Sequence, residues 1–338
     1  MILVTGGTGF LGSHLVCRLV KDGCKVRVLH RRTSDFSIFN RVAKYNHLTD
    51  PEINRFVDWE EADILDPYRL EEVVNDISVI YHCAGMVSFQ PGDGKRLNKI
   101  NINGTANLIN AALQSKVQNF CHVSSTAAIG RADHELIIDE RVIWKNSNRN
   151  SRYAVSKYGA EREVWRGIAE GLNAVIVNPS IILGPGEVNS GSTRMIRVVD
   201  KGLYFYTPGS NGFVDVRDVV NIMIKLINGN IFNERFIISS ENVTYKELFS
   251  YMAKYLHKPA PKFAANGFLS EITWRLEHAR HYIFGSKPLI TRETARTARV
   301  FYAYSNEKIR QAIDYQFIPI EKCIADSCRF YLADKNND

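Results

Sequence analysis

The chain opens with the stretch that decides its fold, Ile2-Leu3-Val4-Thr5-Gly6-Gly7-Thr8-Gly9-Phe10-Leu11-Gly12. Its first residues predict a buried strand, and the amphipathic pattern from Phe10 to Lys21 predicts the helix that follows. Gly6 allows a tight turn, Gly9 lets the backbone approach a pyrophosphate, and Gly12 lets the helix pack closely on the strand. The helix N-terminus offers N–H groups and a positive dipole to the anion. We therefore predict a dinucleotide site at Gly6, Thr8, Gly9, Phe10, Leu11 and Gly12.

Beyond this turn, short apolar runs alternate with helical patterns as far as Pro179. The predicted strands cover residues 2–4, 25–29, 55–57, 79–81, 119–123 and 174–177, and the predicted helices cover 10–21, 95–114 and 152–169. Continuous apolar strands separated by helices are typical of a parallel sheet that helices cover on both faces. Right-handed crossovers make such a sheet doubly wound. The predicted fold class is α/β, with a Rossmann-type doubly wound parallel sheet.

The pattern changes after Pro179, where glycine and proline cluster at 184–186 and 208–212. Helical patterns follow at residues 216–227, 245–256, 269–284 and 307–313. They indicate a smaller, mostly helical C-terminal lobe that would bind the substrate. We predict a dinucleotide-binding domain at 1–180, a substrate lobe at 181–332 and a frayed tail at 333–338. A strand at 235–238 could rejoin the sheet, so that residues 213–240 would complete it.

The composition is that of an average globular protein and excludes a disordered or collagen-like chain. Of 338 residues, 45% are apolar and 23% are charged, and the net charge is +7. Because the basic residues are spread along the chain, we expect no nucleic-acid partner. The six cysteines form no C-x-x-C pair, so we expect no metal site. No apolar stretch is long enough for a membrane span, and the first strand leaves no room for a signal peptide, so we expect a cytoplasmic protein without membrane contact.

The end of the second predicted strand should read the adenosine ribose of the dinucleotide. An NAD site usually has an acidic residue there, whereas this chain has His30-Arg31-Arg32. Guanidinium groups suit a 2′-phosphate because they form bidentate, charge-assisted hydrogen bonds. We therefore predict NADP as the cofactor, bound by Arg31 and Arg32, with NAD as the less favoured choice. The alternative is that both arginines are surface charges and that Asp35 serves the ribose.

A tyrosine and a lysine lie four residues apart in Tyr153-Ala154-Val155-Ser156-Lys157. In a helix this spacing places both side chains on one face. A neighbouring cation stabilises a phenolate, so we expect Lys157 to lower the pKa of Tyr153 toward the range of an acid–base catalyst. The pair follows Val123-Ser124-Ser125, at the carboxyl end of the fifth predicted strand, where open parallel sheets bind ligands.

Several motifs taken together resemble the extended short-chain dehydrogenase/reductase family, part of the NAD-dependent epimerase/dehydratase superfamily. They are Thr5–Gly12, Asp63-Ile64, His82-Cys83-Ala84-Gly85, Asn101-Ile102-Asn103-Gly104-Thr105, Val123-Ser124-Ser125, Tyr153–Lys157 and Asn178-Pro179-Ser180. The resemblance is closest to the branch of dihydroflavonol-4-reductase-like and 3β-hydroxysteroid-dehydrogenase-like proteins. Sugar-nucleotide epimerases more often have arginine where Asn178 stands.

This resemblance implies roles for individual residues. The implied catalytic residues are Ser125, which would bond the substrate oxygen, Tyr153, which would transfer the proton, Lys157, and Asn101, which would support the lysine. Ser124 is the alternative to Ser125, and Lys157 would also hold the nicotinamide ribose. Asp63 and Ile64 would flank the adenine, Ala84 and Gly85 the middle of the cofactor, and Pro179 and Ser180 the nicotinamide.

The resulting hypothesis is an NADP(H)-dependent oxidoreductase that interconverts a ketone or aldehyde and an alcohol by hydride transfer. A sugar-nucleotide epimerase or dehydratase with tightly bound NAD is one alternative, and a non-catalytic NADP-sensing protein is another. The partner would be a small-molecule substrate whose identity stays open, and a homodimer is a further expectation. The apolar, basic stretch 267–284 could be a lid, part of the lobe's packing or a membrane-surface helix.

Overall fold

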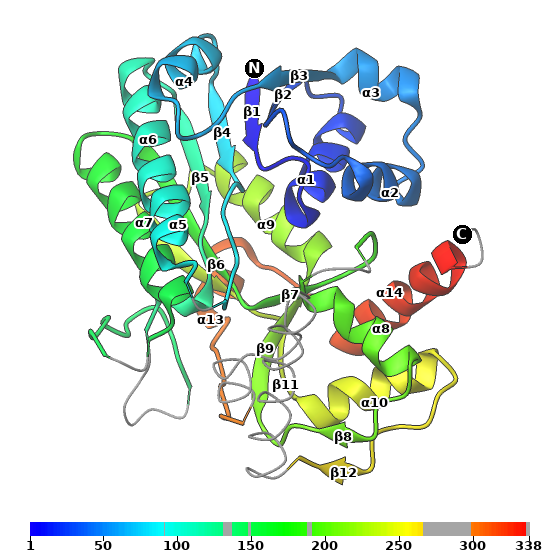
Figure 1. Ribbon diagram of the computed structural model, residues 1–338. Helices are drawn as coiled ribbons and strands as arrows, with labels where there is room; N and C mark the ends of the chain where they lie inside the picture. The colour runs from blue at the N-terminus through cyan, green and yellow to red at the C-terminus, as the bar shows by residue number, and fades with distance from the viewer. Residues whose placement is uncertain (91, 131–136, 148–149, 188–190, 266–298, 336–338) are drawn as a thin grey trace.

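A seven-stranded parallel sheet runs through the N-terminal part of this computed structural model (Figure 1). The structure describes residues 1–90, 92–130, 137–147, 150–187, 191–265 and 299–335. The strands are β1 (Ile2–Thr5), β2 (Val26–His30), β3 (Val57–Glu61), β4 (Val79–His82), β5 (Asn119–Val123), β6 (Asn173–Pro179) and β10 (Glu234–Ile238). Their order is β10-β6-β5-β4-β1-β2-β3, and every neighbouring pair is parallel. The run around 235–238 therefore belongs to this sheet, as its edge strand.

Helices cover both faces of the sheet. One face carries α1 (Phe10–Lys21), α2 (Ser37–Tyr45) and α9 (Val216–Asn228), and the other carries α4 (Pro67–Val74), α6 (Gly104–Gln114) and α7 (Arg152–Ala169). Because successive strand residues point to opposite faces, Val4 packs in the first core and Leu3 in the second, both without exposed surface. The predicted Rossmann-type α/β fold is confirmed.

The third strand begins later than the sequence pattern indicates. Residues 50–56 form the helix α3 (Asp50–Phe56), so the strand predicted at 55–57 is wrong except for its last residue, Val57. Thr49 and Glu52 form a capping box and Pro51 lies in the first turn, which together start a helix that extends through Phe56. Local capping therefore outweighs the strand preference of Phe56.

The long helix predicted at 95–114 contains a change of helical type. It begins as α5 (Gly94–Leu97), continues as a π-helical turn, η1 (Asn98–Asn103), and then becomes α6. A π-helical turn widens the helix and is often found at functional sites. Here it contains Asn101, whose side chain is buried against the sheet side of the helix.

The C-terminal lobe contains strands that the sequence pattern did not reveal. A three-stranded sheet joins β7 (Ile181–Leu183), β9 (Ser210–Asp215) and β11 (Glu241–Thr244), and a two-stranded one joins β8 (Phe205–Tyr206) and β12 (Phe263–Ala264). Around them lie α8 (Arg194–Asp200), α10 (Tyr245–Tyr255) and α14 (Ile320–Lys335), seen at the lower right of Figure 1. These strands are too short, and too close to glycine and proline, to show a periodicity.

Three expectations about the C-terminal part need correction or lie outside the structure. The predicted helices at 216–227 and 307–313 exist as α9 and α13 (Glu307–Ile313), but they pack against the main sheet and not within the lobe. The frayed tail is wrong for residues 333–335, which belong to α14. The Lys335 ammonium lies 2.7 Å from an Asp200 carboxylate oxygen and holds the last helical turn. The stretch 267–284 lies outside the described residues.

Candidate functional site

The glycine turn lies where the strand order of the sheet reverses. Strands β1 and β4 are neighbours, so the segments that follow them meet at one edge of the sheet. Gly6 has a φ of +70°, and a Cβ at this residue would lie 2.7 Å from the backbone nitrogen of Ala84. Only glycine fits this contact. Dinucleotides bind in the crevice at such a switch point.

The first turn of α1 is free to bind an anion. Its N-cap residue, Gly9, provides no side chain to bond the terminal N–H groups, and the turn contains no acidic residue. A Cβ at Gly12 would lie 2.1 Å from the carbonyl oxygen of Gly6, so the helix packs directly on the turn. The N–H groups of this turn have no side-chain cap, so together with the helix dipole they are suited to bind a pyrophosphate.

A cleft of about 620 Å³ opens at this turn. Of the predicted cofactor-binding residues, those that line it are Gly6, Thr8, Gly9, Arg31, Asp63, Ile64, Ala84 and Gly85. Those that do not line it are Phe10, Leu11, Gly12, Arg32, Ser124, Tyr153, Lys157, Pro179 and Ser180. Eight of the predicted cofactor-binding residues therefore line the cleft and nine do not, and the part that each takes in cofactor binding stays a prediction.

The basic side chains at the cleft differ from the predicted pair. Arg31 and Arg32 are both exposed, but Arg31 lines the cleft and Arg32 does not. Asp35, the alternative ribose ligand, does not line the cleft, and its carboxylate accepts hydrogen bonds from the Ser37 backbone nitrogen and hydroxyl at 2.8 and 2.9 Å. Arg96 and Lys99, on the opposite wall, were missed by sequence reasoning, because helical charges usually indicate a solvated face.

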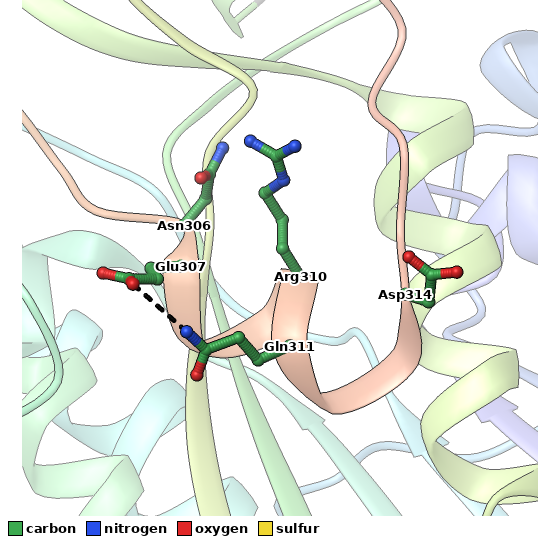
Figure 2. A pocket seen from close by; sticks show the side chains of 5 residues that line it. All are labelled: Asn306, Glu307, Arg310, Gln311 and Asp314. Carbon is green, nitrogen blue, oxygen red and sulfur yellow. Dashed lines mark hydrogen bonds between the residues drawn. The ribbon is translucent and has the colours of Figure 1, made fainter.

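A second hollow, of about 590 Å³, lies along α13. Figure 2 shows its lining side chains, Asn306, Glu307, Arg310, Gln311 and Asp314. The Gln311 amide donates a hydrogen bond of 3.1 Å to the Glu307 carboxylate. This bond neutralises none of the charges on the lining side chains. It contains neither the glycine turn nor any predicted site residue, and the helix that begins at its wall, α13, has only seven residues, so its similar volume does not make it a competing site.

Tyr153 and Ser125 lie close together near the dinucleotide cleft at the glycine turn. Ser151 caps α7 by accepting a 2.8 Å hydrogen bond from the Ala154 nitrogen, so the helix starts just before Tyr153. Tyr153 and Ser125 lie close enough for the serine side chain to lower the pKa of the tyrosine in part, and the ring of Phe89 packs edge-on against the tyrosine at 5.5 Å between centroids. The tertiary structure thus brings together a hydroxyl pair from segments 28 residues apart, the arrangement predicted to bind a substrate oxygen.

Lys157 and Asn101 lie near each other, because the side chains of both approach Gly85. The buried Lys157 ammonium donates a 2.8 Å hydrogen bond to the carbonyl of Val123, the last residue of β5. The Asn101 amide donates to the Ser156 hydroxyl at 2.9 Å and to the Met86 carbonyl at 3.0 Å. A Cβ at Gly85 would be 3.7 Å from the Lys157 nitrogen, so this glycine opens the space before the lysine.

The expected effect of Lys157 on Tyr153 is not what the structure shows. Burial raises the pKa of Tyr153, the nearby Ser125 side chain lowers it in part, and no effect of Lys157 on it is resolved. Burial also lowers the pKa of Lys157 to about 8. The pKa of Tyr153 is therefore raised and not lowered as predicted, because desolvation by burial is the largest influence on it.

The remaining predicted residues are held in the scaffold near the strand ends. Pro179 is the last residue of β6, and the Ser180 backbone nitrogen donates a 3.0 Å hydrogen bond to the Ile238 carbonyl of β10. The Ser124 nitrogen donates to the Val177 carbonyl at 2.8 Å. Within the described ranges, no group of three or more metal-ligating side chains gathers, and no helix has both the length and the apolar run needed to cross a bilayer.

Comparisons with known proteins agree with this geometry. A model of the "NAD dependent epimerase/dehydratase family" matches residues 2–237. The chain belongs to the NAD-dependent epimerase/dehydratase family. The match includes the glycine turn, the cleft and all four predicted catalytic positions, so the family resemblance inferred from the motifs is confirmed.

Relatives in this family include several reductases. The chain is 25% identical over 334 residues to a putative dihydroflavonol 4-reductase of Synechocystis, covering 97% of this chain and 93% of that one. It is 27% identical over 264 residues to the sterol demethylase protein B of Methylococcus capsulatus, covering 78% and 76%. Petunia hybrida cinnamoyl-CoA reductase 1 is 24% identical, with 97% of this chain covered and 91% of the relative.

Solved structures show the same fold along nearly the whole chain. The crystal structure of gox2253 has a TM-score of 0.79 at 26% identity and covers 99% of this chain and 98% of its own. The UDP-glucose 4-epimerase of Thermotoga maritima, solved with UDP-glucose, has a TM-score of 0.77 at 19% identity and covers 99% of each. This family member is thus an NAD(P)-dependent enzyme that acts on CH–OH or carbonyl groups.

Proposed function

We propose that this chain is an NADPH-dependent reductase that converts a ketone or aldehyde into an alcohol. The observation that carries the proposal is the juxtaposition of two features, a cation-lined dinucleotide cleft and the neighbouring side chains of Ser125 and Tyr153. The similarity to dihydroflavonol and cinnamoyl-CoA reductases supports reduction, without fixing the substrate.

The chain's own residues have separable tasks in this reaction. When bound, NADPH would supply the hydride to the carbonyl carbon. Ser125 would hold the carbonyl oxygen, and Tyr153 would give that oxygen its phenolic proton. A raised pKa keeps Tyr153 protonated at neutral pH, which is the form that a reduction needs. Lys157 would hold the ribose hydroxyls and limit the charge that builds up on the phenol.

The preference for NADP over NAD is assigned to Arg31. This guanidinium lines the cleft, and Asp63 is the one acid among the described residues that line it. One Asp63 carboxylate oxygen already accepts a 2.9 Å hydrogen bond from the Leu65 nitrogen. Arg31, Arg96 and Lys99 therefore leave the cleft positively charged, which suits a dinucleotide with an additional phosphate.

Replacing Arg31 by alanine is expected to weaken NADPH binding by about 10- to 100-fold, the worth of a charge-assisted hydrogen bond. NADH binding should change little, because NADH lacks the 2′-phosphate. Isothermal titration with both nucleotides measures this. Arg32→Ala is the matched control and should leave both affinities near their original values. Equal losses for NADPH and NADH in Arg31→Ala would contradict the assignment.

The reaction itself is tested by following NADPH absorbance with a panel of aromatic ketones, steroid-like ketones and nucleotide sugars. Net NADPH consumption with a ketone supports the reductase. Protein that is purified with retained NAD and consumes no NADPH would instead favour an epimerase or dehydratase. A cytoplasmic location, a homodimer and the absence of nucleic-acid and membrane partners stay predictions.

A further inference from the structure

A buried carboxylate lies one helical turn beyond the predicted catalytic lysine. Glu161 follows Lys157 by four residues on α7, and only 1% of its surface is exposed. An ionised carboxylate at this depth is costly unless it is paired and hydrogen-bonded. The Asn178 amide donates a hydrogen bond to one of its oxygens, and an Arg235 guanidinium nitrogen lies 3.6 Å from the other.

The first of these partners leads to the predicted substrate-binding serine. The same Asn178 amide nitrogen that bonds Glu161 also donates a 2.9 Å hydrogen bond to the carbonyl oxygen of Ser125. Glu161 therefore orients the amide that holds the backbone at Ser125. A change at Glu161 would therefore affect the position of Ser125 through a single intervening side chain, that of Asn178.

The second partner leads to the segment between Ser125 and Tyr153. Arg235, on the edge strand β10, donates hydrogen bonds of 2.6 and 2.9 Å to the carbonyls of Glu140 and Val142. Glu161 thus ties the sheet edge to the segment that connects the serine to the tyrosine. The carboxylate is therefore linked to Ser125, where that connection begins, and to residues 140–142 within it.

The charge of Glu161 acts on Lys157 itself. Burial lowers the pKa of Lys157, and the nearby carboxylate counteracts this by favouring the ammonium form. The other titratable groups that face the lysine from β4 and β5 are held neutral by burial. It lowers the pKa of His82 to about 3 and that of His122 well below its usual value, and it raises the pKa of Cys83 to about 12. Arg235 is the charged group facing Glu161 from β10.

We propose that Glu161 is a positioning residue for the Ser125, Tyr153 and Lys157 set. Its carboxylate holds Ser125 through Asn178, anchors the 140–142 segment through Arg235, and supplies the negative charge that keeps Lys157 an ammonium ion. The inference rests on the proposed function only for the statement that this set is catalytic. The effects of Glu161 on the charge of Lys157 and on the position of Ser125 do not depend on which reaction the protein catalyses.

The central experiment is Glu161→Gln in the full chain, with Glu161→Asp beside it. Glutamine keeps an oxygen that accepts the Asn178 hydrogen bond but removes the charge. Lys157 then loses a group that raises its pKa, so the ammonium should be lost at a pH about one unit lower. The basic limb of the carbonyl-reduction rate should move down by the same amount. Glu161→Asp keeps the charge and should keep the limb near its original position.

A titration that needs no substrate separates this proposal from the proposed function. Protein labelled with carbon-13 at the lysine ε-carbons is titrated by NMR, and Lys157→Met assigns the resonance. Glu163→Gln is the matched control on the same helix, because Glu163 pairs with Arg166 at the surface at 3.0 Å. It should leave the Lys157 titration unchanged. An unchanged Lys157 midpoint in folded Glu161→Gln overturns the electrostatic role, whether or not any ketone is reduced.

A second variant keeps the positioning role testable if Glu161→Gln fails to fold. Asn178→Ala removes the hydrogen bonds to the Ser125 carbonyl and to the Glu161 carboxylate. It should lower kcat by about tenfold and raise KM less, because Ser125 loses the contact that holds its backbone. A kcat equal to that of the unmodified chain would overturn the positioning role.

Discussion

Replacement of Tyr153 by phenylalanine is expected to reduce turnover by about 10²- to 10⁴-fold, the usual worth of a positioned acid–base group. The phenol lies close to the Ser125 side chain, and its pKa is raised by burial, so in the native chain it carries the proton that the product alcohol needs. Phenylalanine preserves the edge-on contact with Phe89 but carries no proton. Steady-state NADPH consumption with any working substrate measures the loss.

Two measurements separate a lost proton donor from a damaged site. NADPH affinity, measured by titration, should stay within a few-fold, because Tyr153 does not line the dinucleotide cleft. Tyr158→Phe is the matched control on the same helix, since Tyr158 stacks on Trp144 at 4.4 Å and has no assigned catalytic task. It should retain nearly full turnover. Undiminished turnover in Tyr153→Phe would end the assignment of Tyr153 as the proton donor.

Replacement of Gly12 by alanine is expected to damage both folding and cofactor binding. The new Cβ would lie 2.1 Å from the Gly6 carbonyl oxygen and 2.9 Å from the Gly7 Cα, and these are backbone atoms that cannot rotate away. We expect the free energy of unfolding to fall by about 1–3 kcal/mol, as for overpacked cores. The displaced turn should also weaken NADPH binding by at least about tenfold, because the helix N–H groups move with it. Denaturant unfolding and nucleotide titration measure the two effects.

Gly94→Ala provides the comparison for this steric effect. Its Cβ would also make a contact of 2.8 Å, but with the side chain of Arg152, which can move. Although Gly94 is buried, the Arg152 side chain can yield, so the variant's unfolding free energy should change by less than about 1 kcal/mol. If Gly12→Ala were as stable as Gly94→Ala, the close packing of α1 on the glycine turn would not be required for this fold.

Much of the fold follows from local sequence patterns. The run of Ile2, Leu3 and Val4 before the glycine turn, and the periodicity of α1 and α7, predicted the strands and helices that form the sheet and its covering layers. The errors arose where local signals competed, as at Phe56, where a capping box extended α3 into the predicted strand. The short strands β7, β8 and β12 had no readable period, because each has only two or three residues and depends on its neighbours.

The candidate site likewise has parts that local sequence predicts and parts that depend on the fold. The glycine turn and the spacing of Tyr153 and Lys157 are local features that can be read from the sequence. The choice of Arg31 over Arg32, and the presence of Arg96 and Lys99 on the opposite wall, depend on how the segments after β2 and β4 face each other. Charge patterns alone do not contain that information.

Local sequence patterns were enough to predict a dinucleotide-binding sheet and a tyrosine and a lysine on one helix face, because both follow from short-range backbone geometry. The protonation behaviour of those side chains depends on the folded arrangement around them. Burial raises the pKa of Tyr153. The Lys157 ammonium donates a hydrogen bond to the Val123 carbonyl, and Glu161 lies between Asn178 and Arg235. Desolvation depends on what packs around a group, and those neighbours come from strands that are far apart in the sequence.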